Sequence, residues 1–286
     1  MKKKIAIVTG CSSGLGYLIF KKLISDGFKV YGVSKNKRKI LFAEKKLKKE
    51  NISSNKYSIS KLDVAHYPSV KNFIKKIIYK EKKIDVLINN AGIYGPMGFY
   101  EKNNYKYWRE AFEINFFGCL NFYKEVLPVM KKRNYGRIVQ IAGGGATKSF
   151  PMFTSYSSAK AAIVRFSETL SDECSTYNIK INSIAPGALN THFLDQAIKA
   201  GPQKIGKSFY NKMKKIKIKG GDDISKAINL TSYLCSNRCN INGKLISSLW
   251  DKWQKFEANI NKLVSSDIFT IRRIAGRDRK MKEFDV

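Results

Sequence analysis

Short apolar runs alternate with longer helical patterns along most of this 286-residue chain. Each run has the length of a buried strand, and the residues after it repeat their apolar positions every three or four residues, as in an amphipathic helix. The predicted strands are residues 5–8, 29–33, 56–62, 84–88, 137–142, 180–185 and 244–247. The predicted helices are residues 14–25, 38–50, 70–79, 105–130 and 154–177. Strands that alternate with helices predict an α/β fold, a doubly wound parallel sheet with helices on both faces.

The alternation also predicts how the chain is divided. Residues 1–247 are expected to form one domain, because no internal repeat or low-complexity linker interrupts them. Within this domain, Gly, Lys and Pro break the apolar pattern over residues 190–221, which form either a lid over a substrate or a plain surface excursion. Residues 248–286 form a C-terminal extension. Its Trp250 and Trp253 are expected to pack on the core or on a partner subunit.

The charge of the chain is strongly positive, at +32, with 54 Lys and Arg against 22 Asp and Glu. Such a charge is compatible with nucleic-acid binding. However, Arg supplies only 10 of the basic residues, and Lys is spread along the whole chain. Nucleic-acid readers depend on Arg for bidentate contacts to bases. We therefore interpret the charge as a solvated lysine surface and expect no specific nucleic-acid partner. Hydrophobic residues, at 43%, exclude a disordered chain.

The cysteines and the N-terminus bear on metal binding and location. No two of the five cysteines form a Cys-x-x-Cys pair and the chain has only two histidines, so we expect no metal site. Scattered cysteines are typical of the reducing cytosol. The first apolar run, residues 5–8, is too short for the core of a signal peptide. No stretch reaches the roughly 18 apolar residues of a membrane span. We therefore expect a cytoplasmic protein with no membrane partner.

A glycine-rich turn, Thr9-Gly10-Cys11-Ser12-Ser13-Gly14-Leu15-Gly16, joins the first strand to the first helix. Glycines let the backbone turn sharply and approach a pyrophosphate closely. The N-terminus of the following helix offers free N–H groups and the positive end of its dipole. The strand before the turn and the helix after it are the context that a dinucleotide-binding motif needs.

Further motifs follow at the ends of later strands or within helices. They are Asp63-Val64, Asn89-Asn90-Ala91-Gly92, Asn115, Tyr156-Ser157-Ser158-Ala159-Lys160 and Pro186-Gly187-Ala188-Leu189-Asn190-Thr191. With the Thr-Gly-x-x-x-Gly-x-Gly spacing of the turn, this series resembles the short-chain dehydrogenase/reductase family, in its simple single-domain type. The resemblance covers residues 5–246. It implies a Rossmann fold and an oxidoreductase that uses a nicotinamide cofactor to interconvert a carbonyl and a secondary alcohol.

The resemblance also implies roles for individual residues. Tyr156 would act as acid and base, Lys160 would anchor the cofactor ribose and lower the tyrosine pKa, and Asn115 would hold a relay water. Tyr156 and Lys160 are four residues apart on a helix, so both face one side of it. An ammonium group close to a phenol favours the phenolate. The cofactor-binding residues that the resemblance implies are Gly10, Ser12, Ser13, Gly14, Leu15, Gly16, Ser34, Lys35, Arg38, Asp63, Val64, Asn90, Ala91, Gly92, Tyr156, Lys160, Pro186, Gly187, Leu189 and Thr191.

One position departs from the family. Its catalytic Ser is replaced by Gly143. That Ser donates a hydrogen bond to the substrate oxygen, and loss of such a donor costs roughly 10²–10³ in rate. Three interpretations remain open. A backbone N–H of the run 143–145 replaces the hydroxyl, Thr147 or Ser149 replaces it, or the protein is a catalytically weak, cofactor-binding regulator. We favour an active enzyme, because the Tyr, Lys and Asn are all present.

The end of the second strand indicates which cofactor is preferred. An acidic residue there would bind the ribose 2′-hydroxyl of NAD and repel a 2′-phosphate. The position is occupied by Ser34, and Lys35, Lys37 and Arg38 follow it. The missing carboxylate and the added cations predict that NADP(H) is preferred over NAD(H).

The substrate is expected to be a small carbonyl or alcohol compound. The glycine run and the tail resemble a subgroup associated with bacterial surface-polysaccharide gene clusters, which suggests a sugar-related metabolite. Eight lysines over residues 199–219 would attract phosphorylated or carrier-linked compounds, so a 3-oxoacyl carrier-protein reductase is the alternative. The apolar helices 105–130 and 154–177 form a subunit interface in the family, which implies a homodimer or homotetramer.

Overall fold

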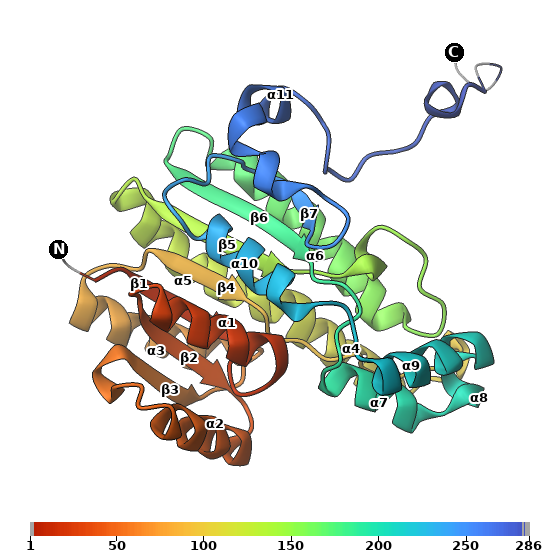
Figure 1. Cartoon of the computed structure of the whole chain (residues 1–286), viewed down its shortest axis with the longest axis horizontal. Helices are drawn as coiled ribbons and strands as arrows, with labels where there is room; N and C mark the ends of the chain where they lie inside the picture. The colour runs from red at the N-terminus through yellow and green to blue at the C-terminus, as the bar shows by residue number, and fades with distance from the viewer. Residues whose placement is uncertain (1–2, 282, 284–286) are drawn as a thin grey trace.

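The computed structural model describes residues 3–281 and 283. Its centre is a parallel sheet in the order β3-β2-β1-β4-β5-β6-β7 (Figure 1). The strands are β1 Ile5–Thr9, β2 Lys29–Ser34, β3 Tyr57–Lys61, β4 Val86–Asn89, β5 Gly136–Ile141, β6 Ile179–Ala185 and β7 Leu245–Ser247. Strands β2 and β3 follow β1 toward one edge of the sheet, and β5, β6 and β7 follow β4 toward the other edge. The carboxyl ends of β1 and β4 therefore form the switch point at which such sheets bind ligands.

Helices cover both faces of the sheet, which confirms the predicted fold class (Figure 1). Side chains of α1, α2 and α10 pack on one face, and side chains of α3, α5 and α6 pack on the other. The helices are α1 Gly14–Ser25, α2 Lys37–Lys49, α3 Tyr67–Glu81, α4 Tyr105–Phe112, α5 Gly118–Lys132, α6 Thr154–Glu173, α7 His192–Ala200, α8 Pro202–Ile205, α9 Lys207–Lys219, α10 Ile224–Leu234 and α11 Ile260–Val264.

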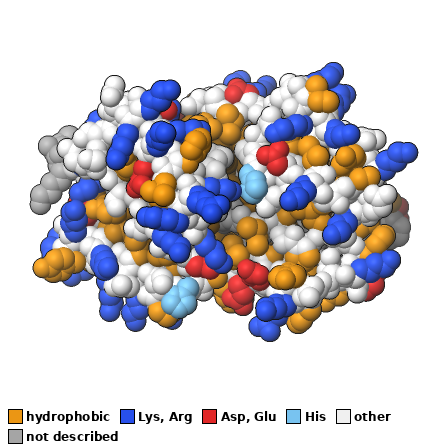
Figure 2. Space-filling view, turned by 90° about the horizontal axis from the view of Figure 1, so that it is seen from below, with side chains coloured by type: hydrophobic (Ala, Val, Ile, Leu, Met, Phe, Trp, Pro, Cys, Tyr) orange, Lys and Arg blue, Asp and Glu red, His pale blue; other side chains and the backbone are white. Residues whose placement is uncertain are grey.

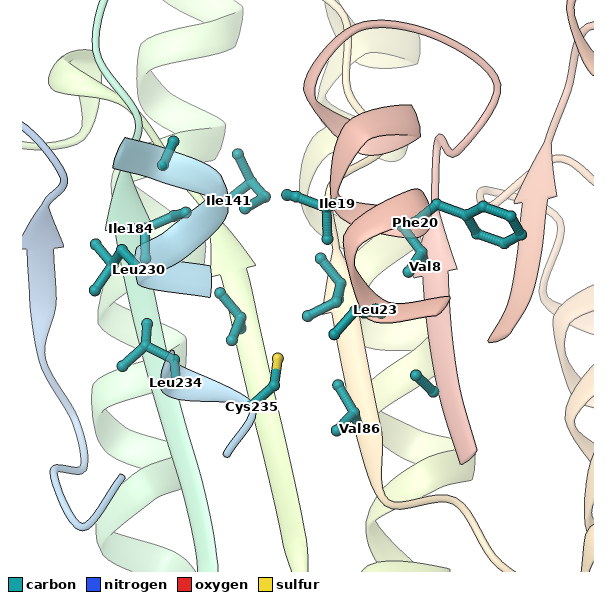
Figure 3. Packing of buried hydrophobic residues seen from close by; sticks show 14 of the residues in the cluster. Val8, Ile19, Phe20, Leu23, Val86, Ile141, Ile184, Leu230, Leu234 and Cys235 are labelled. Carbon is teal, nitrogen blue, oxygen red and sulfur yellow. The ribbon is translucent and has the colours of Figure 1, made fainter. Parts of the chain in front are cut away.

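Strand β1 shows why its sequence is a continuous apolar run. Successive side chains of a strand point to opposite faces of the sheet. Ala6 and Val8 pack beneath α1 and α10, whereas Ile5 and Ile7 pack beneath α3 and α5. Because both faces are covered, no position on this strand requires a polar residue. Figure 3 shows part of the core on the α1 and α10 face, where side chains of the sheet such as Val8 and Ile184 lie beneath Leu23 of α1 and Leu230 of α10.

The helix predicted over residues 105–130 is not one regular α-helix. It is interrupted between α4 and α5 by a five-residue π-helical segment, Glu113–Phe117. The side chain of Asn115, inside this segment, hydrogen-bonds both backbone groups of Ile93. Single-turn π segments are often found at functional sites. The helix predicted over residues 154–177 also ends earlier, at Glu173.

Residues 190–221 are helical rather than irregular. They form α7, α8 and α9, and glycines at positive φ, Gly201 and Gly206, separate these short helices. The sequence pattern hides them because α9 buries only Met213 among many lysines. The helix α10 was likewise not predicted.

The first part of the C-terminal extension packs on the body of the molecule, and the last part extends away from it (Figure 1). Phe256 and Leu263 are buried in the core on the α1 and α10 face. Trp253 stacks on Tyr233 with 5.6 Å between ring centroids, as expected. Trp250 does not pack on this core, because its side chain is 84% exposed. Residues 282 and 284–286 of the predicted extension lie outside the described residues.

Each helix in the described part of the chain is either too short or too polar to span a lipid bilayer. The five cysteines are buried and unpaired, and burial raises the pKa of the Cys239 thiol to about 11. Across residues 3–281 and 283, His, Cys, Asp and Glu side chains form no group of three or more that could hold a metal ion.

The core on the α10 face gives a test of stability. Leu230 is fully buried there. Leu230→Ala should lower the free energy of unfolding by about 2–5 kcal/mol, since it removes apolar contacts and leaves a cavity. Ile218, on α9, is 83% exposed. Ile218→Ala should therefore change the free energy of unfolding by less than about 0.5 kcal/mol. Urea denaturation measures both values, and equal losses would contradict this packing.

Candidate active site

A cleft of about 790 Å³ lies at the carboxyl ends of the strands. Its walls come from the glycine-rich turn, the residues that follow β2 to β6, the helices α7 and α9, and the first residues after β7. The face seen in Figure 2 is hollowed near its middle, with Lys and Arg side chains spread around the hollow. Of the cofactor-binding residues predicted from the sequence, only Arg38 is missing from the walls of the cleft.

The glycine-rich turn is held very close to the segment after β4. The Nδ2 atom of Asn90 donates hydrogen bonds to the carbonyl oxygens of Thr9 and Gly10, at 2.9 and 3.3 Å. A Cβ atom on Gly16 would lie 2.2 Å from this Nδ2 atom and 2.4 Å from the Gly10 oxygen. Only glycine fits at this position.

The helix α1 begins at the turn with its N–H groups available. Its N-cap residue, Ser13, makes no capping hydrogen bond through its side chain. Gly14, Leu15 and Gly16, the first residues of α1, line the cleft. Free N–H groups at a helix N-terminus form an anion site, which fits the pyrophosphate of a dinucleotide.

The end of β2 carries hydroxyls and cations. The Oγ atoms of Ser34 and Ser12 are 2.7 Å apart. The Nζ atom of Lys35 lies 2.7 Å from Oδ2 of Asp63, so this cation is paired with the carboxylate after β3. The Asp63 pairing raises the pKa of Lys35.

The position of Arg38 at the start of α2 bears on its predicted cofactor contact, which stays a prediction. The helix α2 begins at Lys37, and its cap Asn36 accepts a hydrogen bond from the backbone N–H of Lys39. In this register Arg38 is exposed and lies outside the cleft, whereas Lys39 is half-buried and lines it. The sequence pattern does not single out Lys39, because it does not fix the first residue of α2 and therefore which lysine faces the cleft.

Tyr156 and Lys160 lie one turn apart on α6, and both line the cleft. The Nζ atom of Lys160 donates a hydrogen bond to the carbonyl oxygen of Ile141 at 2.8 Å, and lies 5.7 Å from the ring centroid of Tyr156. Burial lowers the pKa of Lys160. Burial, with a smaller contribution from Tyr94, raises the pKa of Tyr156. Burial thus dominates the pKa of Tyr156 in this structure, and the lowering expected from Lys160 stays a prediction.

Asn115 lies behind the wall of the cleft rather than in it. It is fully buried. Its Oδ1 atom accepts from the N–H of Ile93 at 3.0 Å, and its Nδ2 atom donates to the Ile93 carbonyl at 2.8 Å. Its observed contacts hold the segment that follows β4 in place beside Lys160.

Gly143 adopts a conformation that serine rarely takes. Its φ is +155°, and a Cβ atom there would lie 3.1 Å from Oη of Tyr156. Gly144 and Gly145 also line the cleft, as does Ser149, whereas Thr147 does not. In the described part of the chain, no acceptor is found for the N–H groups of residues 143–145.

Three aromatic rings that were not predicted lie close to the ring of Tyr156. Tyr94, Phe193 and Phe150 lie 5.0, 6.1 and 6.4 Å from its ring, between centroids. They belong to three segments that are far apart in the sequence, so no local pattern could have brought them together. Trp250, from the start of the extension, also lines the cleft.

Comparisons with known proteins agree with this geometry. The short chain dehydrogenase family matches residues 4–201. The chain belongs to this family. It is therefore an NAD(P)-dependent oxidoreductase of the short-chain dehydrogenase type.

Individual relatives cover most of the chain. The 3-ketodihydrosphingosine reductase of Bacteroides thetaiotaomicron is 34% identical over 68% of this chain and 67% of its own length. The acetoacetyl-CoA reductase of Cupriavidus necator is 33% identical over 67% of this chain and 76% of its own length. Among solved structures, an actinorhodin polyketide ketoreductase with NADPH aligns with a TM-score of 0.77 and 23% identity, over 86% of this chain and 95% of its own. That structure supports the fold.

The close approach at Gly16 gives a test of the turn. Gly16→Ala should weaken binding of the dinucleotide at least tenfold and lower the midpoint of thermal unfolding, because its Cβ would overlap the Asn90 side chain and the Gly10 carbonyl oxygen. Gly144 has open space around its Cβ position, so Gly144→Ala should leave both values nearly unchanged. Calorimetric titration with the cofactor measures the affinity. Wild-type affinity in Gly16→Ala would contradict the described packing of the turn.

Proposed function

We propose that this chain interconverts a carbonyl and a secondary alcohol, with NADP(H) as cofactor and Tyr156 as acid and base. The observation that carries the proposal is the position of Tyr156 and Lys160 in the same cleft as the glycine-rich turn. The cleft thus combines a site for an anionic dinucleotide with a phenol that can exchange a proton.

The residues present fit a dinucleotide. The N-terminus of α1 would hold the pyrophosphate, Asp63 and Val64 would face the adenine, and Thr191, next to Gly14, would hold the nicotinamide amide. When bound, the cofactor supplies or accepts the hydride that the reaction needs. The remaining predicted contacts along the walls are Gly10, Ser12, Ser13, Leu15, Gly16, Ser34, Lys35, Asn90, Ala91, Gly92, Lys160, Pro186, Gly187 and Leu189.

Tyr156 is suited to donate a proton to a carbonyl oxygen as it becomes an alkoxide. Its raised pKa keeps the phenol protonated at neutral pH, so the reducing direction starts from the correct protonation state. Lys160 lies beside the ring and carries the cationic charge that stabilises the phenolate left behind. Asn115 would hold the backbone after β4 in place. It would also hold the relay water that the family resemblance implies.

Tyr156→Phe should reduce turnover by roughly 10²–10⁴, because it removes the proton donor and leaves the ring packing intact. In the wild type, kcat for reduction should be flat through neutral pH, and kcat for alcohol oxidation should rise with pH as the phenol ionises. Initial rates across a pH series test both directions. Unchanged turnover of the Phe variant would contradict the assigned role.

We propose that a backbone N–H of residues 143–145 replaces the hydroxyl donor that is missing at Gly143. Gly144→Pro removes one of these N–H groups, while Pro is acceptable at the first position of a helical turn. Gly144→Ala keeps the N–H and adds a similar small side chain. The Pro variant should lose roughly 10²–10³ in kcat, and the Ala variant should remain close to the wild type. Equal activity of the two would contradict a role for the Gly144 N–H, and would leave the N–H groups of Gly143 and Gly145 and the hydroxyl of Ser149, which line the cleft, as candidate donors.

The preference for NADP(H) is supported by the end of β2. Ser34 stands where a carboxylate would repel a 2′-phosphate, and Lys39 faces the cleft with no ion pair among the described residues. Lys35 adds a second cation beside Asp63.

Lys39→Ala should reduce the ratio of kcat/KM for NADPH to that for NADH by about tenfold, as expected for loss of one charged hydrogen bond. Arg38→Ala removes the same charge one residue away, outside the cleft, and should change the ratio by less than about twofold. A wild type that prefers NADH would contradict the proposed cofactor.

The substrate side of the cleft favours apolar compounds. Aromatic rings surround Tyr156, which suits an acyl chain or a ring better than the sugar-related metabolite expected from the sequence. A 3-oxoacyl thioester reductase is the second candidate. It is supported by the similarity to an acetoacetyl-CoA reductase. A regulator without turnover is the third, and it would bind NADPH but reduce no carbonyl.

We also propose a homodimer or homotetramer in the cytoplasm. Exposed aromatic side chains on α4 and at the junction with α5, Tyr105, Tyr107 and Phe117, support an interface along these helices. The unpaired, buried cysteines suit a reducing compartment. Residues 192–219 would cover the substrate as the lid expected from the sequence, since α7 and α9 supply walls of the cleft.

A further inference from the structure

The wall next to Tyr156 is apolar over several elements. Phe150 lies 5.3 Å from Phe209, between ring centroids, and so links the loop after β5 to α9. Phe193 of α7 and the buried Met213 of α9 complete this wall. An apolar portion of a substrate would lose contact with water here, which favours binding in proportion to the area covered.

Two lysines border this apolar wall. Lys148 lies two residues before Phe150, and Lys212 lies on α9 between Phe209 and Met213. Both side chains line the cleft and are exposed. Neither forms an ion pair with any residue that the structure describes. They come from the elements that supply the apolar wall, and not from the glycine-rich turn.

The carboxylates of the cleft do not neutralise these lysines. Asp63 is paired with Lys35 at 2.7 Å. Asp222 accepts a hydrogen bond from the backbone N–H of Ala188 at 2.7 Å. The pKa of His192 is lowered by burial and by Lys39, so it adds no further positive charge at neutral pH. The substrate side of the cleft therefore combines apolar surface with unpaired positive charge.

We propose that the substrate is an apolar carbonyl compound that carries an anionic group, a carboxylate or a phosphate. The inference rests on the proposed carbonyl reduction at Tyr156. The apolar part lies against Phe150, Phe193 and Phe209, and Lys148 and Lys212 hold the anion. This arrangement would orient the substrate, because its apolar part and its anionic group have separate partners along the walls of the cleft.

Binding can be measured without turnover. The probes are a straight-chain methyl ketone that ends in a carboxylate, its neutral methyl ester, and a ketone of equal length that ends in a phosphate monoester. Each is titrated by calorimetry into the protein saturated with NADP⁺. At least one anionic probe should bind about tenfold more tightly than the ester, as two partly exposed ion pairs allow. The probe that binds more tightly distinguishes carboxylate from phosphate.

Variants attribute the preference to the two lysines. The double variant Lys148→Gln and Lys212→Gln should reduce the affinity for the anionic probe to that of the ester, without changing the affinity for the ester. The control, Lys215→Gln with Lys219→Gln, removes the same charge from α9 outside the cleft and should retain the preference. Equal affinity of the wild type for anionic and neutral probes, or equal effects of the two double variants, would overturn the proposal.

Turnover tests the proposed function separately. The anionic probe that binds best should be reduced by NADPH, with the double variant impaired in KM rather than kcat. Tight, lysine-dependent binding without turnover would contradict carbonyl reduction and would also overturn the assignment of the anion as a substrate. Turnover with no preference for the anion would leave the proposed function in place and remove only this inference.

Discussion

The hydrogen bonds between the ends of β1 and β4 are the contacts on which the cleft depends. The Oγ1 atom of Thr9 accepts from the N–H groups of Asn90 and Ala91, both at 2.9 Å, and the side chain of Asn90 binds back to the carbonyl of Thr9. These contacts hold two neighbouring strand ends in register at the switch point of the sheet. The glycine-rich turn can then lie directly against the Asn90 segment, and the N-terminus of α1 faces the cleft. Larger residues at Gly10 or Gly16 would separate these segments.

Other elements supply the remaining parts of the site around the ends of β1 and β4. The helix α6 presents Tyr156 and Lys160, and the π-helical segment allows Asn115 to bind the backbone after β4. Burial keeps the phenol protonated, whereas the same burial disfavours the charged form of Lys160. Its ammonium group is compensated by the carbonyl oxygen of Ile141. The substrate side is then shaped by rings and lysines from segments that no family motif includes.

The sequence was sufficient for the parts of the molecule that local patterns encode. Strand β1 is an uninterrupted apolar run because both faces of the sheet are covered. The turn after it has glycines at the spacing that its close approach to the segment after β4 requires. The position of Arg38 could not be predicted in the same way, since it depends on the helical phase of α2. The helix α9 buries only Met213 among many lysines, and α7 and α8 are short, so their periodicity could not be recognised. The rings around Tyr156 meet only through tertiary packing, and the exposure of Trp250 follows from how the extension folds back.

The most direct test of the account is a crystal structure of the protein with NADP(H). We expect the pyrophosphate at the N-terminus of α1, the 2′-phosphate beside Ser34 and Lys39, and the nicotinamide next to Tyr156. A 2′-phosphate directed away from Lys39 would contradict the cofactor preference. A nicotinamide bound away from Tyr156 would contradict the central claim that this tyrosine exchanges the proton in carbonyl reduction.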